Sequence, residues 1–373
     1  MKINCTTQAL INTLNIVTKT SGIKTTMPIL EGVLLEAYDG RVKFTTNDLN
    51  LGCESIIECE VEEEGKSVVD IKMLNEIIRK LGSDNVKIEA DDTLFTIKSS
   101  SGIYKLAVMN PDEFPRLPII DVKQSINVSQ KIFKDMISKT LFCVSTENTR
   151  PIYTGALVKV EDNILTVVAI DGFRLALKKH VSDKKINDFK AIIPGKTLSE
   201  LLKILDDSDE EKTVKIGVNE NQALFEMSNT TIVSRILEGD FLNYNSIIPE
   251  NKETRVKVNT KSLLDSFERV ALFATENTEK AKKLPVKLDI GIDGLTISCI
   301  SQTGDAKEFI PAVVEGNELE IGFNPRFLTD ALRVIDDPEI YIDFNTSISP
   351  VVIRSISSND YLYIVLPVKL RQE

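Results

Sequence analysis

The residues of this chain that could carry out chemistry are few, and the most suggestive group is the Gly-Lys-Thr within IIPGKTLSELL, residues 192–202. A phosphate-binding loop of this type needs a glycine five residues before Gly195, and that position holds Lys190. The apolar residues that follow have the spacing of a helix. We therefore interpret the segment as a helix start whose Lys196 faces solvent or a phosphate backbone, not as a nucleotide site.

Other catalytic or metal-binding patterns are missing from the sequence. The single histidine, His180, follows two lysines and is expected at an exposed strand end, not as a general base. The carboxylate pairs Asp206–Asp207 and Asp336–Asp337 follow helical segments, which is typical of solvated turns. The sequence has no His/Cys cluster, no G-x-S-x-G and no G-x-G-x-x-G. It therefore predicts a protein that is not an enzyme and uses no metal or other cofactor.

Composition narrows the class of protein further. Hydrophobic residues make up 42% and charged residues 27% of the 373 residues, as in ordinary globular proteins. The net charge of -11 argues against a general affinity for nucleic acids. No run of apolar residues is long enough to span a membrane, and the first residues lack the apolar core of a signal peptide. Five scattered cysteines without a C-x-x-C pair indicate reduced thiols, so we expect a cytoplasmic protein with no membrane partner.

Six segments have the apolar spacing of amphipathic helices, and they come in three pairs. The predicted helices are residues 6–20, 70–81, 129–143, 194–205, 259–272 and 324–335. The two helix starts of each pair are 64 or 65 residues apart. The pairs themselves recur with a period of about 125 residues, which is too long for a solenoid and indicates three similar domains.

Strand-like runs fill the space between the predicted helices. Runs such as GVLLEAYDGRVKFTT alternate apolar and polar residues around a turn signal. The turn signals are Asp39–Gly40, Asp162–Asn163 and Asp293–Gly294. Proline-rich segments near residues 110–125 and 240–255 are the expected linkers. We predict an α+β fold of three similar domains, each with two helices packed on an antiparallel sheet. The predicted domains are residues 1–120, 126–249 and 254–373.

Charge is divided unevenly between the predicted helices and the rest of the chain. The predicted helices carry a formal charge of +6. Because the net charge of the whole chain is -11, the remaining residues carry -17. Helix propensity alone does not explain this division, because Glu favours helices as much as Lys does. We infer that the helices share an electropositive surface that contacts phosphates without reading bases.

Four motifs, together with the three-domain spacing, resemble those of the bacterial DNA sliding clamp family, the beta subunits of DNA polymerase III. The motifs are TTMPILEGVLLEA (25–37), NPDEFPRLP (110–118), AIDGFRLAL (169–177) and YLYIVLPVKL (361–370). The resemblance covers the whole chain. It implies a head-to-tail homodimer that forms a ring of six similar domains, with helices lining the central hole.

The function implied by the resemblance is that of a DNA polymerase processivity factor. Such a ring encircles double-stranded DNA, slides without base readout and tethers the replicative polymerase, which raises the local concentration of the enzyme at the primer end. Further implied partners are the clamp loader and other replication and repair proteins that carry short apolar clamp-binding motifs.

The resemblance also assigns residues to three surfaces. The positions implied to face DNA are Lys24, Arg150 and Lys196. The peptide-binding cleft between the second and third domains is implied to consist of Tyr153, Ile170, Gly172, Phe173, Arg174, Leu175, Leu242, Ile247, Ile348, Ile364, Val365, Leu366, Pro367 and Val368. At the joints of the ring, Tyr104 and Leu106 of the first domain are implied to meet Leu272 and Phe273 of the third.

Four positions depart from the commoner family pattern. Phe173 stands where many members have His, Tyr153 where Leu is frequent, Leu242 where Pro is frequent and Ser246 where Arg is frequent. We expect these differences to leave the apolar character of the implied cleft in place and to affect its exact partner motif and its affinity.

Two alternatives to the clamp hypothesis remain. One is an acidic multidomain adaptor that binds peptides but does not encircle DNA, and the other is an enzyme with its site at a domain junction. The residues from Ile364 to Val368 also suit a purely structural strand.

Overall fold

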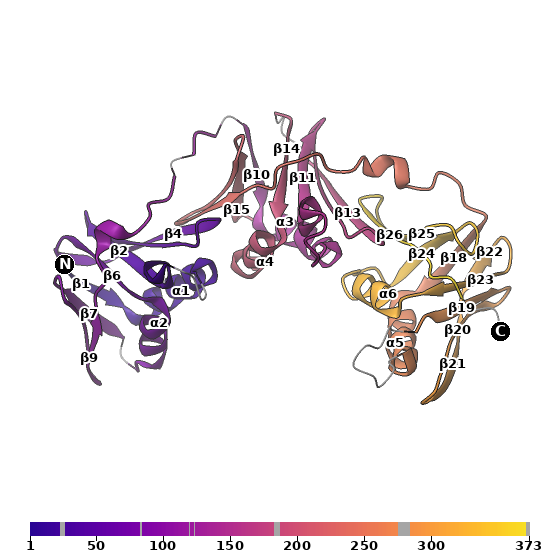
Figure 1. Cartoon of the computed structure of the whole chain (residues 1–373), viewed down its shortest axis with the longest axis horizontal. Helices are drawn as coiled ribbons and strands as arrows, with labels where there is room; N and C mark the ends of the chain where they lie inside the picture. The colour runs from indigo at the N-terminus through magenta and orange to yellow at the C-terminus, as the bar shows by residue number, and fades with distance from the viewer. Residues whose placement is uncertain are drawn as a thin grey trace. The chain divides into compact units, whose positions relative to one another are not determined.

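The computed structural model describes residues 1–22, 27–82, 84–118, 120–122, 124–182, 187–274 and 284–370 of the chain. They form two compact units. Unit 1 combines Met1–Phe133 with Lys196–Ile236, and unit 2 combines Lys134–Gly195 with Leu237–Glu373. The course of the chain through each unit can be followed by its colour in Figure 1.

All six segments with helical spacing form α-helices, so this prediction is confirmed. The helices are α1 (Thr7–Val17), α2 (Ile71–Lys80), α3 (Gln130–Ser138), α4 (Gly195–Ile204), α5 (Thr260–Val270) and α6 (Pro325–Leu332). In four of them the residue before the helix caps it by accepting a hydrogen bond from a backbone N–H of the first turn. These capping residues are Thr6, Asp70, Asn259 and Asn324.

Unit 1 contains two antiparallel sheets. The five-stranded sheet has the order β5 (Glu60–Glu63), β1 (Lys2–Thr6), β7 (Asn85–Ala90), β8 (Leu94–Ser99) and β9 (Gly102–Ala107). The eight-stranded sheet has the order β10 (Gln124–Ser129), β15 (Thr213–Val218), β16 (Gln222–Met227), β17 (Thr230–Arg235), β4 (Leu51–Glu58), β3 (Arg41–Asn47), β2 (Gly32–Tyr38) and β6 (Gly65–Asp70).

Unit 2 also contains two antiparallel sheets. The nine-stranded sheet has the order β14 (Phe189–Pro194), β11 (Gly155–Glu161), β12 (Ile164–Ile170), β13 (Arg174–Val181), β26 (Tyr361–Val365), β25 (Val351–Ser355), β24 (Glu339–Phe344), β18 (Thr254–Asn259) and β22 (Val313–Glu315). The four-stranded sheet has the order β21 (Gly304–Pro311), β20 (Gly294–Ser301), β19 (Val286–Gly291) and β23 (Leu319–Phe323).

Three repeats of one strand pattern underlie these sheets. Each repeat has a first three-stranded meander, which is β2–β3–β4, β11–β12–β13 or β19–β20–β21, and a second one, which is β7–β8–β9, β15–β16–β17 or β24–β25–β26. The last strand of a first meander pairs with the last strand of the next repeat's second meander. This happens twice, at the first junction (β4 with β17) and at the second junction (β13 with β26). Because a sheet runs across each junction, the compact units differ from the three predicted domains, whose boundaries stay a prediction.

Tight turns within the first meanders occur at the predicted signals. Asp39 and Gly40 have φ angles of 46° and 73°, and Asp162 and Asn163 have φ angles of 51° and 63°. Two successive positive φ values are those of the type I′ turn that suits the twist of a two-residue hairpin. Gly294, with φ 156°, follows Asp293 at the corresponding turn of the third repeat.

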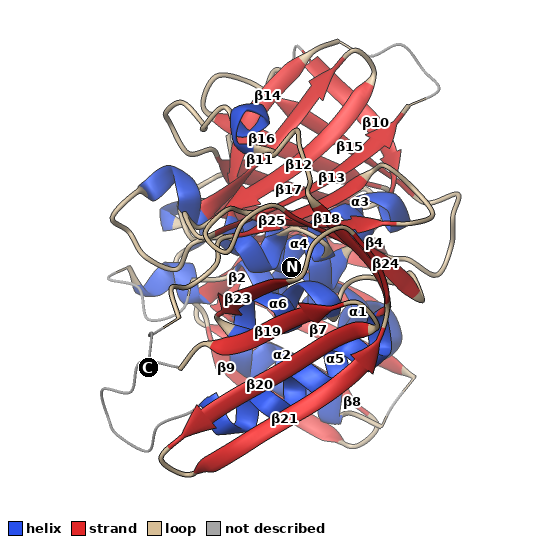
Figure 2. Cartoon of the chain, turned by 90° about the vertical axis from the view of Figure 1, so that its right-hand side faces the viewer, coloured by secondary structure: helices blue, strands red, loops and turns tan. Residues whose placement is uncertain are grey.

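Within each unit the helices pack on the sheets through their apolar faces. Helix α1 contacts α2 and strands β3 and β4, and α5 contacts α6, β20 and β21. Figure 2 shows α5 behind β20 and β21. The side chains of Leu10, Leu14, Leu263 and Phe267 are buried in these contacts. None of the helices in the described ranges is long and apolar enough to cross a bilayer.

Candidate functional site

The two junctions between repeats are built alike. At the first junction Val233 pairs with Gly52, and at the second junction Ile364 pairs with Leu175 at the corresponding positions. The backbone hydrogen bonds just beyond the paired strands also correspond. At one end, the Arg235 N–H donates to Asn50 O at the first junction and the Leu366 N–H donates to Phe173 O at the second, both at 2.8 Å. At the other end, the Ile56 N–H donates to Asn229 O at the first junction (2.9 Å) and the Lys179 N–H donates to Asp360 O at the second (2.7 Å).

In the described ranges, the same pattern leaves two strands, β21 and β9, with one unpaired edge each. Strand β21, the last of the third repeat's first meander, is an edge strand of the four-stranded sheet. Strand β9, the last of the first repeat's second meander, is an edge strand of the five-stranded sheet. Each edge carries exposed apolar side chains, Ile103 (63% exposed) on β9 and Phe309 (58%) on β21. Unpaired apolar edges of this kind favour pairing with another chain.

The four residues implied to form the ring joints lie at these two edges. Tyr104 and Leu106 belong to β9, and Leu272 and Phe273 belong to the 3₁₀ turn Ala271–Ala274, which packs against β20 and β21. A Cβ atom on Gly304, at the start of β21, would lie 3.3 Å from the Phe273 ring. The Phe273 side chain therefore covers the beginning of this edge strand.

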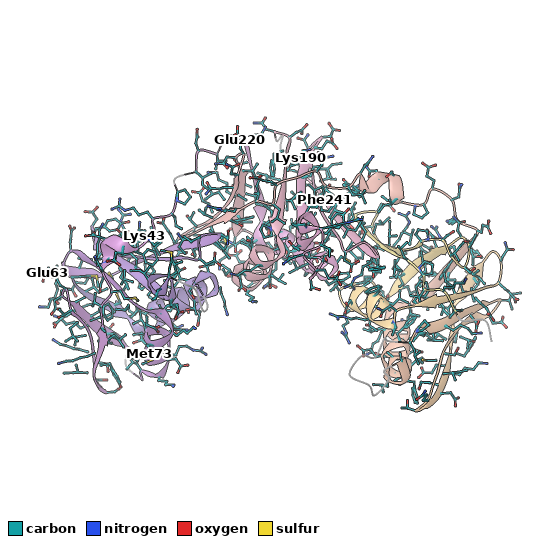
Figure 3. The ribbon with its side chains drawn as sticks, viewed as in Figure 1. Lys43, Glu63, Met73, Lys190, Glu220 and Phe241 are labelled. Carbon is teal, nitrogen blue, oxygen red and sulfur yellow. The ribbon has the colours of Figure 1, made fainter. Side chains whose placement is uncertain are left out.

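An apolar cluster covers one face of the second junction. Its buried members are Tyr153, Leu157, Val168, Ile170, Leu175, Leu177, Ile192, Tyr244, Val352, Leu362 and Ile364, and we call them the junction cluster. The segment that links the second and third repeats packs on it through Phe241, Ile247 and Ile248. The Tyr153 and Phe241 rings meet edge to face, with centroids 6.1 Å apart, and Figure 3 labels Phe241 in this segment.

Strand alternation separates the predicted cleft residues into two groups. Leu175 and Ile364 point into the junction cluster together with Tyr153 and Ile170, and Ile247 packs against it. Arg174 and Val365 are their neighbours in sequence, are paired with each other across β13 and β26, and point to the opposite face. The structure therefore brings only part of the predicted lining together in one apolar cluster.

Five other predicted cleft residues have exposed apolar side chains, and we call these residues the rim. Its members, with the exposed fraction of each, are Phe173 (62%), Leu242 (38%), Ile348 (79%), Leu366 (37%) and Val368 (39%). Gly172 has a φ of 94°, which places it in the tight turn before β13. The Phe173 ring stacks on Phe327 of α6, with centroids 6.3 Å apart, and exposed apolar side chains of this size are candidates for a binding surface.

Arg174 joins the second repeat to the third beneath the rim. Its guanidinium donates to Asp171 Oδ2 (2.8 Å), to Asp330 Oδ2 of α6 (2.9 Å) and to the Phe142 carbonyl (2.8 Å). It also lies over the Phe327 ring, 4.5 Å from the centroid. Burial alone lowers the pKa of Arg174, but the Asp330 and Asp171 carboxylates raise it above its usual value. The guanidinium is therefore a fixed cationic link between β13 and α6.

The polypeptide after β26 is held in place by backbone contacts. The Leu366 N–H donates to Phe173 O and the Val368 N–H donates to Gly322 O, both at 2.8 Å. Pro367, between them, has no N–H to donate, which suits a strand end that leaves its sheet. A side chain at Gly322 would meet the Val368 carbonyl, since a Cβ there would lie 2.6 Å from it.

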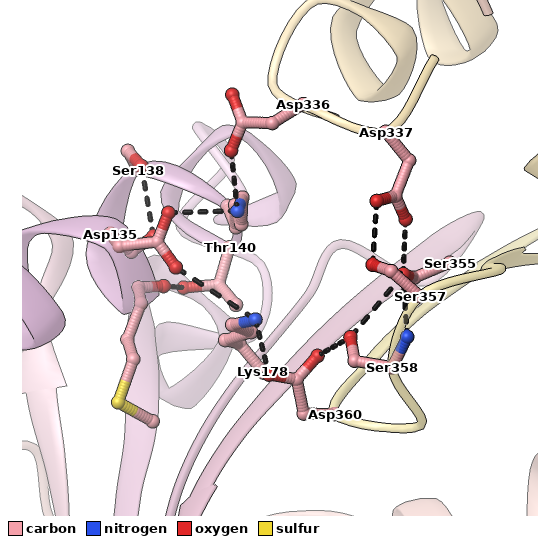
Figure 4. A network of polar contacts seen from close by, with 12 residues as sticks. Asp135, Ser138, Thr140, Lys178, Asp336, Asp337, Ser355, Ser357, Ser358 and Asp360 are labelled. Carbon is pink, nitrogen blue, oxygen red and sulfur yellow. Dashed lines mark hydrogen bonds and ion pairs between the residues drawn. The ribbon is translucent and has the colours of Figure 1, made fainter. Parts of the chain in front are cut away.

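A polar network ties the same two repeats together away from the junction cluster (Figure 4). Lys139 donates to Asp336 (2.8 Å) and pairs with Asp135 (2.8 Å), while Lys178 donates to Asp360 (2.7 Å). Burial raises the pKa of the Asp360 carboxyl, but Lys178 and Ser358 outweigh it and hold this pKa below its usual value. The second junction thus has an apolar cluster on one face and a group of ion pairs away from that cluster.

The residues implied to face DNA have different surroundings. Lys196 is exposed but forms an ion pair with Asp48. Arg150 is exposed, with its guanidinium 5.8 Å from the Tyr153 ring centroid. Lys24 lies outside the described residues.

Many helix cations are already paired within the chain. Lys80 pairs with Glu76 at 2.8 Å, and Lys203 pairs with Glu200 at 2.9 Å. In the described ranges Lys72 is exposed and forms no ion pair. The attraction of the helices for phosphates is therefore weaker than the excess of cations in the helical segments predicts.

In the part of the chain that the structure describes, no three His, Cys, Asp or Glu side chains gather so that they could hold a metal ion. The described cysteines are all free thiols.

Comparisons with known proteins match this architecture along the whole chain. Models of the DNA polymerase III beta subunit match in three parts, the N-terminal domain at residues 1–118, the central domain at 127–243 and the C-terminal domain at 245–369. The beta sliding clamp of Bacillus subtilis is 35% identical over 381 residues, which cover 99% of this chain and 100% of that protein. The beta sliding clamp of Halalkalibacterium halodurans is 35% identical over 372 residues, covering 96% and 97%.

Solved structures agree with the sequence relatives. The crystal structure of the Bacillus subtilis DNA polymerase sliding clamp has a TM-score of 0.94 at 34% identity and covers all of both chains. A DNA polymerase III beta subunit structure from Eubacterium rectale has a TM-score of 0.93 at 33% identity and covers 99% of each chain. The chain therefore belongs to the family of DNA polymerase III beta subunits, the bacterial sliding clamps. These relationships bear out the predicted clamp fold and do not favour the adaptor alternative.

Several residues of the second junction were not singled out from the sequence. Phe142, Phe327 and Asp330 surround Arg174, and the last two lie in the predicted helix at residues 324–335. Asp171 carries a local signal, because an aspartate two or three residues before Phe173 and Arg174 can accept from their backbone N–H groups, as it does here (2.9 and 3.1 Å). The contacts to Phe142 and Asp330 are long-range, and no local pattern announces them.

Proposed function

We propose that this chain is a DNA polymerase processivity factor that works as a head-to-tail homodimeric ring around double-stranded DNA. The observation that carries the proposal is the repetition of one strand pairing. Two of the three repeat-to-repeat pairings are made within the chain, and the two strands needed for the third, β21 and β9, are free edges. Pairing of β21 with β9 of a second copy, and the reverse, closes the assembly without an unpaired end.

The equivalence of the repeats gives this third pairing a register. The count starts at the turn between the second and third strands of each first meander, which is closed by Asp48–Leu51, Asp171–Arg174 and Ser301–Gly304. The residues that follow these pairs are Gly52, Leu175 and Asp305, so these three positions correspond. Counted in the second meanders, Val233 corresponds to Lys105 in β9. Asp305 of one copy would therefore face Lys105 of the other, and opposite charges at such a position favour the pairing.

The same register brings the implied joint residues together. Leu106 of one copy would lie opposite Gly304 of the other. Because Gly304 has no side chain and Phe273 covers it, the Leu106 side chain would pack on the Phe273 ring. Burial of an apolar side chain of this size contributes about 1.5–3 kcal/mol.

We further propose that the junction cluster and its rim bind short apolar segments of partners. The partners are the replicative polymerase, the clamp loader and other replication and repair proteins. The exposed apolar rim at Phe173, Leu242, Ile348, Leu366 and Val368 supports this assignment. Tethering, not chemistry, would be the contribution of the chain to DNA synthesis, so we propose no catalytic role and no cofactor.

Contact with DNA would be weak and would not depend on sequence. Lys24, Arg150 and Lys196 are proposed to face the duplex, and sliding requires that such contacts exchange easily. The ion pair of Lys196 with Asp48 supports weak contact, since a phosphate must compete with an internal carboxylate. We place the protein in the cytoplasm, where replication takes place in bacteria.

Retention on circular DNA tests the enclosure directly. The protein is loaded with clamp loader and ATP onto nicked circular plasmid, separated from free protein by gel filtration, and the plasmid is then cut once. We expect the protein to stay with the circle and to leave after linearisation. Retention on linear DNA with open ends would contradict the proposal.

A further inference from the structure

A cavity of about 290 Å³ lies in unit 2, next to the junction cluster. Its walls are the linking segment at residues 249–252 and strands β18, β24 and β25. Asn345 Nδ2 donates to the Asn251 carbonyl (3.0 Å) and holds the linking segment against the loop after β24. The cavity is therefore formed by elements that are fixed to each other.

Two arginines in this cavity share one carboxylate. Arg255 donates through Nε (2.6 Å) and Nη2 (2.8 Å) to the two oxygens of Asp343, and Arg354 Nε donates to Asp343 Oδ2 (3.3 Å). The Arg255 guanidinium also stacks on Tyr341, 4.6 Å from the ring centroid. Among the described residues, Asp343 is the only carboxylate that pairs with either arginine.

The cavity therefore has an excess of positive charge in a chain whose net charge is -11. The charged lining consists of Lys252, Arg255 and Arg354 against Glu250 and Asp343. Asp343 is buried and already accepts from both arginines, whereas the side chains of Arg255 and Arg354 are 26% and 33% exposed. Their free N–H groups are suited to bind a second carboxylate. Two carboxylates would then accept from the two guanidinium groups.

The sheet connects this cavity to the apolar cluster in a single row. Residues paired directly across successive strands are Arg255, Asp343, Val352, Ile364 and Leu175, from β18 to β13. Paired residues share one face of a sheet. The first two belong to the cavity, the last two to the junction cluster, and Val352 belongs to both.

We propose that the Arg255–Arg354 pair is a carboxylate-binding subsite for the partner segments that bind at the junction cluster. The inference rests on the proposed peptide-binding function and adds a preference to it. Asp343 and Arg255 are two and three strands from Ile364, which corresponds to about 10–15 Å. An extended peptide covers this distance in three or four residues. The preferred partner segment therefore has an Asp or Glu three or four residues from its apolar anchor.

Selection from a random library tests this preference without assuming a motif. Phage-displayed random nonapeptides are selected on the full-length protein and, in parallel, on Arg354→Gln. Arg354→Gln leaves the two shorter Asp343 hydrogen bonds, those from Arg255, in place. We expect apolar anchors in both selections, and an acidic residue three or four positions away only with the original chain.

A matched pair of peptides gives the quantitative test. The most frequent acidic peptide and its Asn or Gln counterpart are compared by fluorescence anisotropy. Loss of the carboxylate should weaken binding about tenfold for the original chain, less for Arg354→Lys and not at all for Arg354→Gln. The control variant is Arg41→Gln in unit 1, which removes an arginine that also pairs with an aspartate and stacks on a tyrosine. It should leave the tenfold difference unchanged.

The outcomes separate this inference from the function on which it rests. Apolar anchors without an acidic preference, or an equal preference with Arg354→Gln, would overturn the carboxylate subsite alone. The absence of any apolar consensus would overturn the peptide-binding function and the subsite with it.

Discussion

The first and second junctions share a backbone arrangement but differ in what covers it. At the first junction, Gly52 leaves a gap on the sheet that the chain's own Leu117 fills, because a Cβ at Gly52 would overlap Leu117 Cδ2. Leu117 and Val122 both belong to the segment that links the first and second repeats. Val122 lies over Gly217, where a Cβ atom would be 2.5 Å from the Val122 side chain. At the second junction, the position equivalent to Gly52 is Leu175, a member of the junction cluster.

This difference supports the proposal that the second junction, and not the first, is a binding site. The linking segment of the first junction places Leu117 and Val122 over two glycines of the sheet. The linking segment of the second junction packs on the junction cluster through Tyr244 and Phe241 but leaves Leu242 and Ile348 exposed at the rim. In this proposal the same strand pairing has different roles at the two junctions, and the side chains that cover the paired strands make the difference.

The largest expected effect comes from Arg174 of the second junction, because the equivalent residue of the first junction, Leu51, is uncharged. Arg174→Met should lower the free energy of unfolding by about 3 kcal/mol, because Asp171 and Asp330 lose their buried partner. The measurement is urea denaturation. The matched control is Leu51→Met at the equivalent position of the first junction, which should cost less than about 1.5 kcal/mol. Equal losses for the two variants would mean that Arg174 is not a specific link.

Removal of the segment after Leu366 separates recognition from closure. A chain that ends before Pro367 should bind polymerase segments at least about 30-fold more weakly, because it lacks Val368 at the rim. Its dimer should persist, since β9 and β21 are intact. Anisotropy measures the binding and sedimentation measures the dimer. A truncated chain that sediments as a monomer would show that the segment is structural.

A substitution at Gly52 tests whether the first junction is filled by its own linking segment. Gly52→Val should destabilise the protein by about 1–3 kcal/mol, because the new side chain displaces Leu117. Thermal unfolding measures the loss. The companion change Leu117→Ala should restore part of the stability of Gly52→Val, and an additive double variant would argue against contact between the two residues.

The smallest expected effect is the pH dependence of the ionic part of the second junction. The folded pKa of Asp360 is lowered, so its stabilisation is present above the ordinary aspartate pKa of about 3.9 and is lost as the pH falls through the lowered value. Asp360→Asn should remove less than about 1 kcal/mol of stability at pH 7 and flatten the acid limb of the urea midpoint. The exposed Asp121→Asn serves as the control. An unchanged acid limb in Asp360→Asn would assign the pH dependence to other carboxyls.

The sequence predicted the local elements of this fold well. Helix spacing, caps such as Asn324 and the turn at Asp39–Gly40 are set by neighbours in the chain, so their signals are local. The period of the repeats also indicated three similar domains. It could not indicate that sheets run across the junctions, because strand partners such as β13 and β26 are far apart in sequence.

The candidate site was predictable only in part for the same reason. Leu175 and Ile364 lie in motifs that resemble a known family, and they do meet in the junction cluster. Arg174 was assigned to the same lining, although alternation turns it toward α6. The Arg255–Arg354 pair has no sequence signal, because β18 and β25 are far apart in sequence and are brought to either side of β24 only by folding.

The pairing of β21 with β9 of a second copy is the central claim, and a disulfide tests it most directly. Tyr104 and Ala306 would face each other at a non-hydrogen-bonded position, equivalent to Tyr363 and Ala176. Tyr104→Cys and Ala306→Cys are combined in a Cys299→Ala background, because Cys299 neighbours Ala306. Under mild oxidation we expect a single covalent dimer on a non-reducing gel, and monomers for either cysteine alone. A ladder of longer polymers, or no crosslink at all, would contradict the closed head-to-tail ring.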